Sequence, residues 1–481
     1  MRQVFLPMSY IYSQRFSLPP TPLTLSLRKE LYTHAYSATN FAAHRNSISP
    51  KDNYHPKSAL LNTINWALVN IYNPLLRGEW MKKRAEDWVY KLIQREDENT
   101  DYACLGPVNA PMNMLACYIR EGPHTYAVRR HAERLSDFLW MTKEGMLANG
   151  TNGVQTWDTA LLIQAVIEAG VAEDPTWRPM LVRALEFLDD QQIREDCRKQ
   201  AECYRHTRKG AWAFSTREQG YTVSDCTAEA VKAVMMLQSL PGYPQLISDA
   251  RIREAIDVLL TMQNPTGGFS SYEPTRGSAA LMERLNASEV FGRIMVEYDY
   301  PECTTAVITA FSLFTRLHPS YRPDEIAASK DKAVDYIRAA QRDDGSWYGS
   351  WGICFSYAGM FALEALAAAG ETYTNSERVR KACRFFLSKQ NKKDGGWGES
   401  YKGCEDGEWR EHPEGSQVVQ TAWVAIALME AGFLEREPIE RALALIMGRQ
   451  KARGEWAQEG IEGVFNKTWY VKKEAENVGG A

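Results

Sequence analysis

A short pattern that recurs along the chain is the strongest constraint on its fold: a helical segment ends in Gln, and a Gly and an aromatic residue follow. The copies are Gln263…Gly267…Phe269, Gln341…Gly345…Trp347, Gln390…Gly395…Trp397, Gln450…Gly454…Trp456 and a looser one, Gln192…Gly210…Trp212. The aromatic positions are 57, 78, 50 and 59 residues apart. Intervals of this size fit one helical hairpin per repeat, so we expect outer and inner helices to alternate around a ring.

The segments between these turns have apolar residues at helical spacing and no convincing alternation of strand type. They are residues 58–95, 111–142, 156–170, 178–193, 226–239, 250–263, 303–317, 329–341, 358–369, 377–390, 417–431 and 437–450. We therefore predict an all-α fold. In each repeat, the Gln is expected to donate to the exposed carbonyls at its helix end and to pack on the aromatic ring, with Gly allowing the turn. The alternative is a set of unrelated helix-ending turns.

Composition sets the remaining limits. The 481 residues are 44% hydrophobic and 24% charged, which is typical of a globular chain of two domains or one large toroid. A net charge of -4 gives no reason to expect a nucleic-acid partner. The nine cysteines form no Cys-x-x-Cys pair and the eight histidines are scattered, so we expect no metal site, no cofactor and free thiols.

Asp225 stands where a helix is expected to begin, over Cys226 to Leu237. Asp is a favoured N-cap residue, and by local sequence alone a plain cap is the preferred interpretation over a catalytic acid.

The wider sequence changes that preference. The Gln and Gly-x-Trp repeats resemble the QW motifs of the triterpene cyclase family, and Val-Ser-Asp-Cys-Thr-Ala-Glu at 223–229 is similar to the acid motif of oxidosqualene cyclases, residue for residue. The resemblance implies an α/α-toroid of the double-barrel type, with one barrel incomplete. Residues 1–140 would then be the remainder of the second barrel, and residues 141–481 the catalytic barrel.

For the site, the resemblance implies that Asp225 protonates an epoxide, with Cys226 and Cys303 as its partners. An acid with this task must be neutral at rest, which burial in an apolar cavity favours, and it needs donors that stabilise the carboxylate left behind. Thiols are weak donors that do not compete as bases. Without the resemblance, Cys303 would be taken for a small core residue.

A polyene cyclisation moves a positive charge along the substrate, and aromatic faces stabilise that charge without capturing it. The aromatic residues in stretches that resemble the family's cavity-lining motifs are Trp157, Phe214, Tyr272, Trp351 and Phe465. The alternative for each is core packing or a role in the repeat.

The activity that the resemblance implies is an isomerase (intramolecular transferase) reaction of sterol and triterpenoid biosynthesis, the cyclisation and rearrangement of (3S)-2,3-oxidosqualene to a tetracyclic triterpene. Asn466-Lys467-Thr468 is similar to lanosterol-forming members, so lanosterol is the expected product. The implied partners are the lipid substrate and a membrane surface, with no obligate protein partner. The implied location is monotopic, on the cytosolic face of the endoplasmic reticulum or on lipid droplets. The helix from Arg251 to Gln263 is a candidate for membrane contact, or an ordinary core helix.

Two departures from the family leave alternatives open. Family members place a Trp-Cys-His-Cys run before the equivalent of Arg2, and its His is implicated in the final deprotonation; after Thr468 they continue through a Tyr-rich strip. We therefore expect a chain truncated at both ends. The alternatives are an inactive cyclase fragment, an α/α-toroid interaction module, or a relative of protein prenyltransferase β-subunits. The last needs a zinc site of Asp, Cys and His, and no His here stands in such a sequence context.

Overall fold

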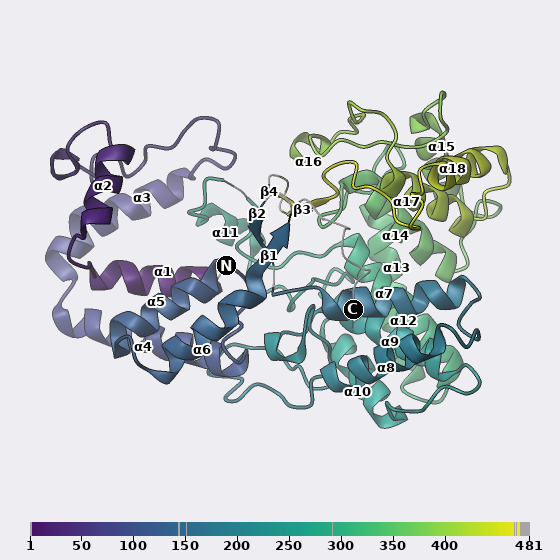
Figure 1. Ribbon diagram of the computed structural model, residues 1–481, viewed down its shortest axis with the longest axis horizontal. Helices are drawn as coiled ribbons and strands as arrows, with labels where there is room; N and C mark the ends of the chain where they lie inside the picture. Colours follow the sequence, from purple (N-terminus) through teal and green to yellow (C-terminus); the bar gives the residue numbers. More distant parts are fainter. Residues whose placement is uncertain are drawn as a thin grey trace.

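The computed structural model describes residues 2–142, 145–150, 152–290, 292–465, 467 and 469–471. Its N-terminal part is a group of packed helices on the left of Figure 1. They are α1 (Arg2–Gln14), α2 (Pro22–Leu31), η1 (Tyr36–Ala38), α3 (Ala59–Ala67), η2 (Leu68–Leu76), α4 (Glu79–Asn99), α5 (Asn109–Glu121), α6 (Tyr126–Arg134) and η3 (Leu135–Phe138). Within this group α1 packs on α4 and α5, and α5 packs on α6.

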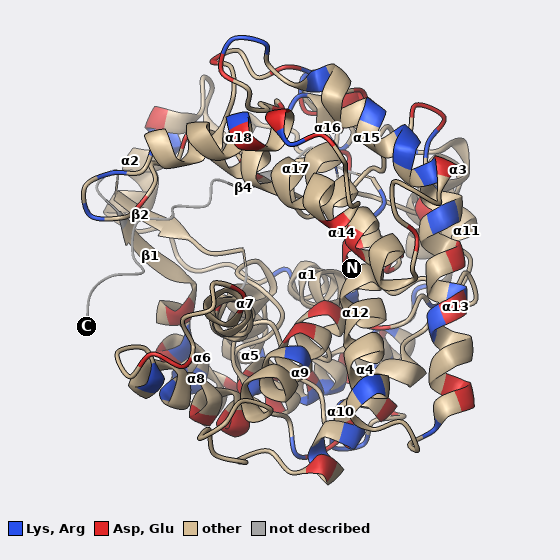
Figure 2. Cartoon of the chain, turned by 90° about the vertical axis from the view of Figure 1, so that its right-hand side faces the viewer, with Lys and Arg blue, Asp and Glu red and all other residues tan. Residues whose placement is uncertain are grey.

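From Gln155 onward, inner and outer helices alternate. The inner helices are α7 (Gln155–Glu168), α9 (Ser224–Gln238), α12 (Pro301–Leu317), α14 (Cys354–Ala368) and α17 (Val418–Glu430). The outer helices are α8 (Arg178–Gln191), α10 (Asp249–Thr261), α13 (Pro323–Ala340), α15 (Glu377–Lys389) and α18 (Glu437–Gly448). Each inner helix contacts the next inner helix and the outer helix that follows it, and together they form an arc (Figure 2). This arrangement is an α/α-toroid and confirms the predicted all-α class.

Proline helps to start several of these helices, because its ring presets the φ angle of the first turn. It occupies the first or second position of α8, α12, α13 and α18. Side-chain caps begin others: Ser58 accepts a bond from the Leu61 N–H at the start of α3 (3.0 Å), and Ser376 caps α15. The short helices η4 (Arg217–Gln219), α11 (Ala279–Arg284) and α16 (Gly403–Asp406) lie in the connections.

The repeats join the outer helices to one another. The Gln side-chain amide donates to the carbonyl of its own repeat glycine and to a carbonyl of the next outer helix. The bonds run from Gln192 to Gly210 (2.8 Å) and Arg251 (3.1 Å), from Gln263 to Gly267 (2.9 Å) and Ser329 (2.7 Å), from Gln341 to Gly345 (3.0 Å) and Arg378 (3.1 Å), and from Gln390 to Gly395 (2.7 Å) and Pro438 (2.9 Å).

The tryptophans complete the joint. Each indole N–H donates to a carbonyl in the last turn of the preceding outer helix: Trp212 to Leu188 (2.9 Å), Trp347 to Ile337 (2.7 Å), Trp397 to Phe386 (2.7 Å) and Trp456 to Ile446 (2.7 Å). The prediction that the Gln satisfies these carbonyls is therefore wrong. The indole N–H is the donor to these carbonyls, and the Gln amide bonds instead to its own repeat glycine and to the next outer helix.

Several predicted ranges need correction. Residues 58–95 are α3, η2 and the first part of α4, with a break at Gly78; the end of 111–142 is strand β1 (Leu139–Thr142), which pairs with β2 (Gly145–Ala148). A second hairpin joins β3 (Gly463–Phe465) to β4 (Trp469–Val471). The candidate membrane helix Arg251–Gln263 corresponds to α10, and its apolar face, which includes Ile256, Val258 and Leu259, is buried in the core.

The largest hydrophobic core of the described part lies between the inner and outer helices and draws its residues from positions 160–464. A smaller core includes Tyr10, Tyr90 and Ile93 and lies among the N-terminal helices. The division of the chain at residue 140 stays a prediction. Among the described helices, none combines the length and the apolar character needed to cross a membrane.

Candidate active site

Asp225 lies in the first turn of inner helix α9 and is only 8% exposed. The helix begins at Ser224, and the cap position belongs to Val223, which makes no side-chain cap bond. The interpretation of Asp225 as a plain N-cap is therefore wrong. Its carboxyl oxygen Oδ1 accepts a hydrogen bond from the backbone N–H of the adjacent Cys226 (2.8 Å). This carboxyl is therefore a buried group of the first turn and not the cap of the helix.

The thiol of Cys303 donates to the other carboxyl oxygen, Oδ2, of Asp225 across 3.2 Å. Cys303 lies on α12, the inner helix next to α9, and is fully buried. Burial raises the pKa of Asp225 to about 6, against the opposing effect of the bonds from Cys303 and Cys226. Burial and the nearby Asp225 raise the pKa of the Cys303 thiol well above its ordinary value, so the thiol stays a donor. Asp225 is thus poised between its neutral and charged forms.

A chain of hydrogen bonds continues behind this pair. The indole N–H of Trp351 donates to Ser271 Oγ (2.8 Å), and Ser271 Oγ lies 3.3 Å from Cys303 Sγ. Since the Cys303 proton is used toward Asp225, the Ser271 hydroxyl must donate to the sulfur, and Trp can only donate. All donors in the chain therefore point toward the Asp225 carboxyl, an alignment that strengthens each bond and stabilises negative charge there.

The buried Glu302, next to Cys303 on α12, holds the loop that carries Trp351. Its Oε1 accepts from the backbone N–H of Ser350 (2.8 Å) and of Trp351 (3.1 Å). Burial raises the pKa of Glu302 to about 7. Sequence reasoning missed both Ser271 and Glu302. Their only signal was adjacency, because Ser271 precedes Tyr272 and Glu302 precedes Cys303.

A first aromatic group gathers around Trp351, whose indole is linked to Asp225 through Ser271 and Cys303. Phe465, in β3, packs at a tilt on Trp351 with ring centroids 5.3 Å apart. Tyr300, which precedes α12, meets Trp351 edge-on at 5.9 Å. The structure thus brings together Trp351 and Phe465, which are over 100 residues apart in sequence, and adds Tyr300 to them.

A second aromatic group surrounds Cys226. Trp157, on α7, stacks on Phe214 with centroids 6.0 Å apart, and both pack with Tyr272 around Tyr221 and Cys226. All the site residues predicted from the sequence therefore lie in one region. The group around Cys226 is connected to the Asp225 hydrogen bonds because Cys226 is adjacent to Asp225 in the chain and Tyr272 is adjacent to Ser271. Their catalytic and binding roles stay predictions. Asn466 and Thr468, on which the product prediction rests, lie outside the described residues.

A buried charged network ties this region to the N-terminal helices. Tyr221, which meets Tyr272 edge-on at 6.1 Å, donates its hydroxyl to Glu96 of α4 (2.5 Å). The guanidinium of Arg205 stacks on the Tyr221 ring at 3.6 Å, contacts Glu96 (3.5 Å) and bonds to Glu273 (2.9 Å). The position of the second aromatic group is therefore coupled to the N-terminal part of the chain.

The squalene-hopene cyclase C-terminal domain matches residues 154–476, which include the whole arc of helices. Lanosterol synthase erg7A of Aspergillus fumigatus is 61% identical over 98% of this chain and 62% of its own length. The lanosterol synthase of Pneumocystis carinii is 53% identical over 98% of this chain and 65% of its own length. The solved structure of ent-copalyl diphosphate synthase from Streptomyces platensis is 15% identical, with a TM-score of 0.48 over 76% of this chain and 55% of that one.

The chain thus spans less than two thirds of the length of the curated relatives that it matches. The family match covers more than half of the chain, including Asp225, Cys303 and the aromatic groups around them. The resemblance inferred from the QW repeats and the acid motif is confirmed: the chain belongs to the squalene-hopene cyclase family.

Proposed function

We propose that this protein cyclises (3S)-2,3-oxidosqualene to a tetracyclic triterpene, lanosterol, as an isomerase of sterol biosynthesis. The observation that carries the proposal is the buried Asp225 carboxyl with the Cys303 thiol donating to it at 3.2 Å. The relatives described above as lanosterol synthases support the same reaction and product.

In the proposed mechanism, Asp225 is neutral when substrate arrives and gives its proton to the epoxide oxygen. The C–O bond breaks, the oxygen becomes a hydroxyl, and the electron-deficient carbon is attacked by the nearest double bond. The carboxylate left on Asp225 is stabilised by the Cys303 thiol and the Cys226 N–H. The proton gained at oxygen is balanced by one lost from carbon when the last cation is quenched, so the reaction is a net isomerisation.

Two aromatic groups near Asp225 suit the migrating charge. One consists of Trp351, Phe465 and Tyr300, linked to Asp225 through Ser271 and Cys303, and the other of Trp157, Phe214 and Tyr272, packed with Cys226. Each ring face stabilises a nearby cation by about 0.5–2 kcal/mol, and the face itself carries no lone pair that would capture the cation.

The test is incubation of the purified chain with oxidosqualene in detergent, with products identified by gas chromatography and mass spectrometry. Lanosterol from the wild type and none from Asp225→Asn is the expected result. Product that persists in Asp225→Asn would remove the assigned acid. Absence of product from a folded wild-type chain would overturn the proposed activity in favour of an inactive fragment.

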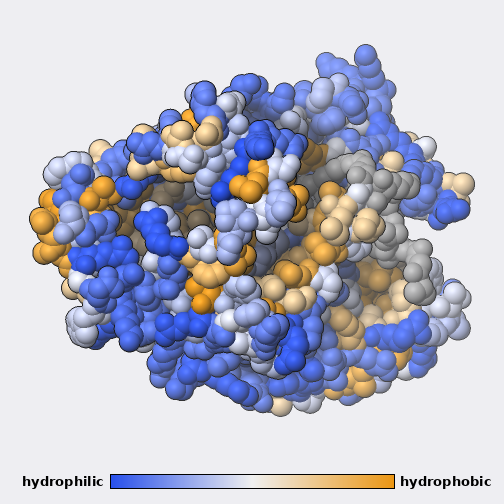
Figure 3. Space-filling view, turned by 60° about the vertical axis from the view of Figure 1, so that its left-hand side comes forward, coloured by the Kyte–Doolittle hydropathy of each residue, from blue (hydrophilic) through white to orange (hydrophobic). Residues whose placement is uncertain are grey.

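We further propose that the protein works on a membrane surface, at the endoplasmic reticulum or on lipid droplets, because its substrate is a lipid. Figure 3, in which the side that carries the N-terminal helices is turned forward, shows hydrophobic patches on the surface. At the end of η2 and the start of α4, Leu75 is 74% exposed, Leu76 59% and Trp80 71%, which is suited to shallow insertion into lipid. The protein should float with liposomes in a density gradient and should float less after Leu75→Asp with Leu76→Asp. A wild-type protein that stays at the bottom would overturn this proposal.

A further inference from the structure

The N-terminal core contains a second cluster of chemically competent side chains, well apart in sequence from the Asp225 site. It consists of Asp97 near the end of α4, Cys104 in the following loop, Cys117 on α5 and His131 on α6. We call these four residues the Asp97 cluster. Asp97 and His131 are each 1% exposed and both cysteines are 0% exposed.

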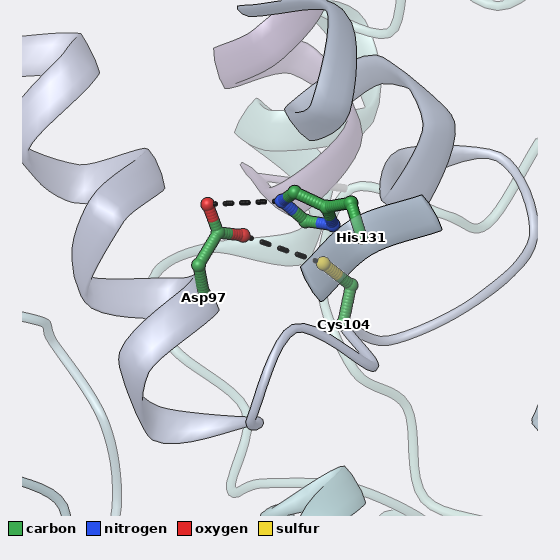
Figure 4. Close-up of side chains that lie close together, drawn as sticks. All are labelled: Asp97, Cys104 and His131. Carbon is green, nitrogen blue, oxygen red and sulfur yellow. Dashed lines mark hydrogen bonds and ion pairs between the residues drawn. The ribbon is translucent and has the colours of Figure 1, made fainter. Parts of the chain in front are cut away.

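The four side chains converge on the Asp97 carboxylate. Oδ2 lies 3.2 Å from His131 Nε2 and 3.6 Å from Cys117 Sγ, and Oδ1 lies 3.5 Å from Cys104 Sγ. Figure 4 shows the Asp97, Cys104 and His131 side chains pointing toward one another from α4, the loop and α6. One ligand atom from each of these three lies within 4.8 Å of the other two.

These separations match the edges of a tetrahedral zinc site. Zinc binds carboxylate oxygen and imidazole nitrogen at about 2.0 Å and thiolate sulfur at about 2.3 Å. At the tetrahedral angle these bond lengths place oxygen and nitrogen about 3.3 Å apart, and oxygen and sulfur about 3.5 Å apart. The ligand atoms of Asp97, Cys104 and His131, which all lie within 4.8 Å of one another, therefore need little adjustment to surround an ion. The Cys117 thiol is 3.6 Å from Asp97 Oδ2 but lies outside that group, so it must move toward the other two ligands to complete the site.

The orientation of His131 provides a second, independent observation. Its ring is buried, and in the described part of the chain neither ring nitrogen has a hydrogen-bond partner, although Nε2 is only 3.2 Å from a carboxylate oxygen. An N–H aimed at that oxygen would form a strong bond at this distance. Two ligand atoms that lie close together without aiming at each other are the arrangement found when both aim at a third atom.

The loop supports the same convergence. Cys104 has φ 56°, in the left-handed region that residues other than glycine rarely adopt, and Asp101 and Tyr102 do so as well. This turn carries the Cys104 thiol back toward α4. Asn113 on α5 donates to Asp97 Oδ1 (2.8 Å) and lies 3.5 Å from Cys104 Sγ, where an amide N–H would stabilise a thiolate.

We propose that Asp97, Cys104, Cys117 and His131 bind a zinc ion that ties α4, α5, α6 and the 100–104 loop together. On binding, each thiol gives its proton to solvent and becomes a thiolate ligand, while Asp97 binds through a carboxylate oxygen and His131 through an unprotonated ring nitrogen. Four protein ligands in a buried setting make this a structural site, with no position open for water or substrate. It differs in this respect from the catalytic zinc site of the prenyltransferase alternative.

The sequence pointed the other way, because these ligands are spaced by 7, 13 and 14 residues and form no Cys-x-x-Cys pair. The group forms only in the folded chain, where His131 comes to lie beside Asp97. The smaller N-terminal core buries few large side chains, so packing stabilises it less than it stabilises the main core. A bound ion would add to the stability of this part.

The first experiment needs no variant. The full chain, purified without a histidine tag or chelator, should contain one zinc per chain by plasma mass spectrometry. After exchange for cobalt, it should show the visible absorption of tetrahedral Co²⁺ and a thiolate-to-metal charge-transfer band in the near ultraviolet. Folded protein without bound zinc, and without a thiolate band when cobalt is added, would overturn the proposal and leave a hydrogen-bonded carboxylate.

Variants identify the ligands. Cys104→Ser and His131→Gln should each lose most of the bound zinc, and Cys117→Ser should weaken the thiolate band. Cys383→Ser is the matched control, because Cys383 is equally buried but lies on α15 of the arc, and it should keep its zinc and its cobalt spectrum. Zinc retained in folded Cys104→Ser and His131→Gln would place the ion elsewhere and overturn this site.

Discussion

The Sγ of Cys303 lies 3.2 Å from Oδ2 of Asp225, a hydrogen bond that joins the inner helices α12 and α9 at the site. The bond favours the charged form of Asp225, and burial favours the neutral form. An acid that must first hold a proton and then release it needs both influences. Because burial is the larger of the two, Asp225 keeps its proton to about pH 6.

Replacement of Asp225 by Asn should lower turnover of oxidosqualene by at least about 100-fold, the usual contribution of a general acid. Asp249→Asn is a matched control, because Asp249 also lies in the first turn of a helix, the adjacent α10, but is exposed. The measurement is the initial rate of lanosterol formation. Equal losses in both variants would point to damage of the fold instead of loss of the acid.

The pH dependence of turnover should follow the protonation of Asp225. The neutral form is the active one, so the rate should fall as the pH rises through about 6. In Cys303→Ala the donor that lowers this pKa is gone, so the falling limb should move to higher pH while the maximal rate decreases. Rates measured between about pH 5 and pH 8 test this, with Cys383→Ala as the control whose profile should not move. An unshifted limb in Cys303→Ala would contradict the assigned hydrogen bond.

Asp225 should also make stability depend on pH. Its folded pKa, about 6, lies above the ordinary value of 3.8, so the folded state holds the proton more tightly. The contribution is therefore fully present below about pH 4 and is lost as the pH rises through about 6. Near neutral pH, Asp225→Asn should be more stable than wild type by up to about 3 kcal/mol, with little difference at pH 4. Thermal unfolding at both pH values measures it; a less stable variant at neutral pH would contradict the raised pKa.

Loss of the Glu302 carboxylate should loosen Trp351. Glu302→Ala removes the acceptor of two backbone N–H groups in the loop, and we expect turnover to fall about 10- to 100-fold as the ring is misplaced. Incompletely cyclised products should appear beside the main one. Glu302→Gln keeps an acceptor oxygen and should restore most of the product pattern, whereas Glu325→Ala, at an exposed position of α13, should change nothing. An unaltered product pattern in Glu302→Ala would remove Glu302 as a positioning residue.

The indole bonds of the repeats should contribute to stability in proportion to their burial. Trp397→Phe leaves the buried Phe386 carbonyl without its donor, which costs about 1–3 kcal/mol. Trp456→Phe breaks the same kind of bond to Ile446, but Trp456 is only partly buried, so water can replace the donor at lower cost. The urea midpoints of the two variants should differ in this order; a larger loss in Trp456→Phe would contradict it.

Much of the toroid was readable in the sequence because the repeat is local. Gln, Gly and Trp lie within a few residues of one another, so their spacing reports a helix end, a turn and the next helix. The short strands and the true donors of the helix-end carbonyls were not readable. Both depend on which atoms of distant segments meet, as when Trp397 reaches a carbonyl of α15 and Gln390 reaches α18.

The sequence by itself determined the alternation of helices and singled out Asp225 as the candidate acid, because both are encoded in contiguous motifs. Tertiary structure decided which groups surround that carboxyl. Ser271, Cys303 and Trp351 come from three segments and meet only because α9, α12 and the loop before α14 pack together. The same holds for Asp97, Cys104, Cys117 and His131, whose spacing carries no metal motif. Short-range sequence patterns determine local conformation. The pKa of a group and the set of ligands around a site depend instead on burial and on neighbouring side chains, which come within a few ångströms only when the chain folds.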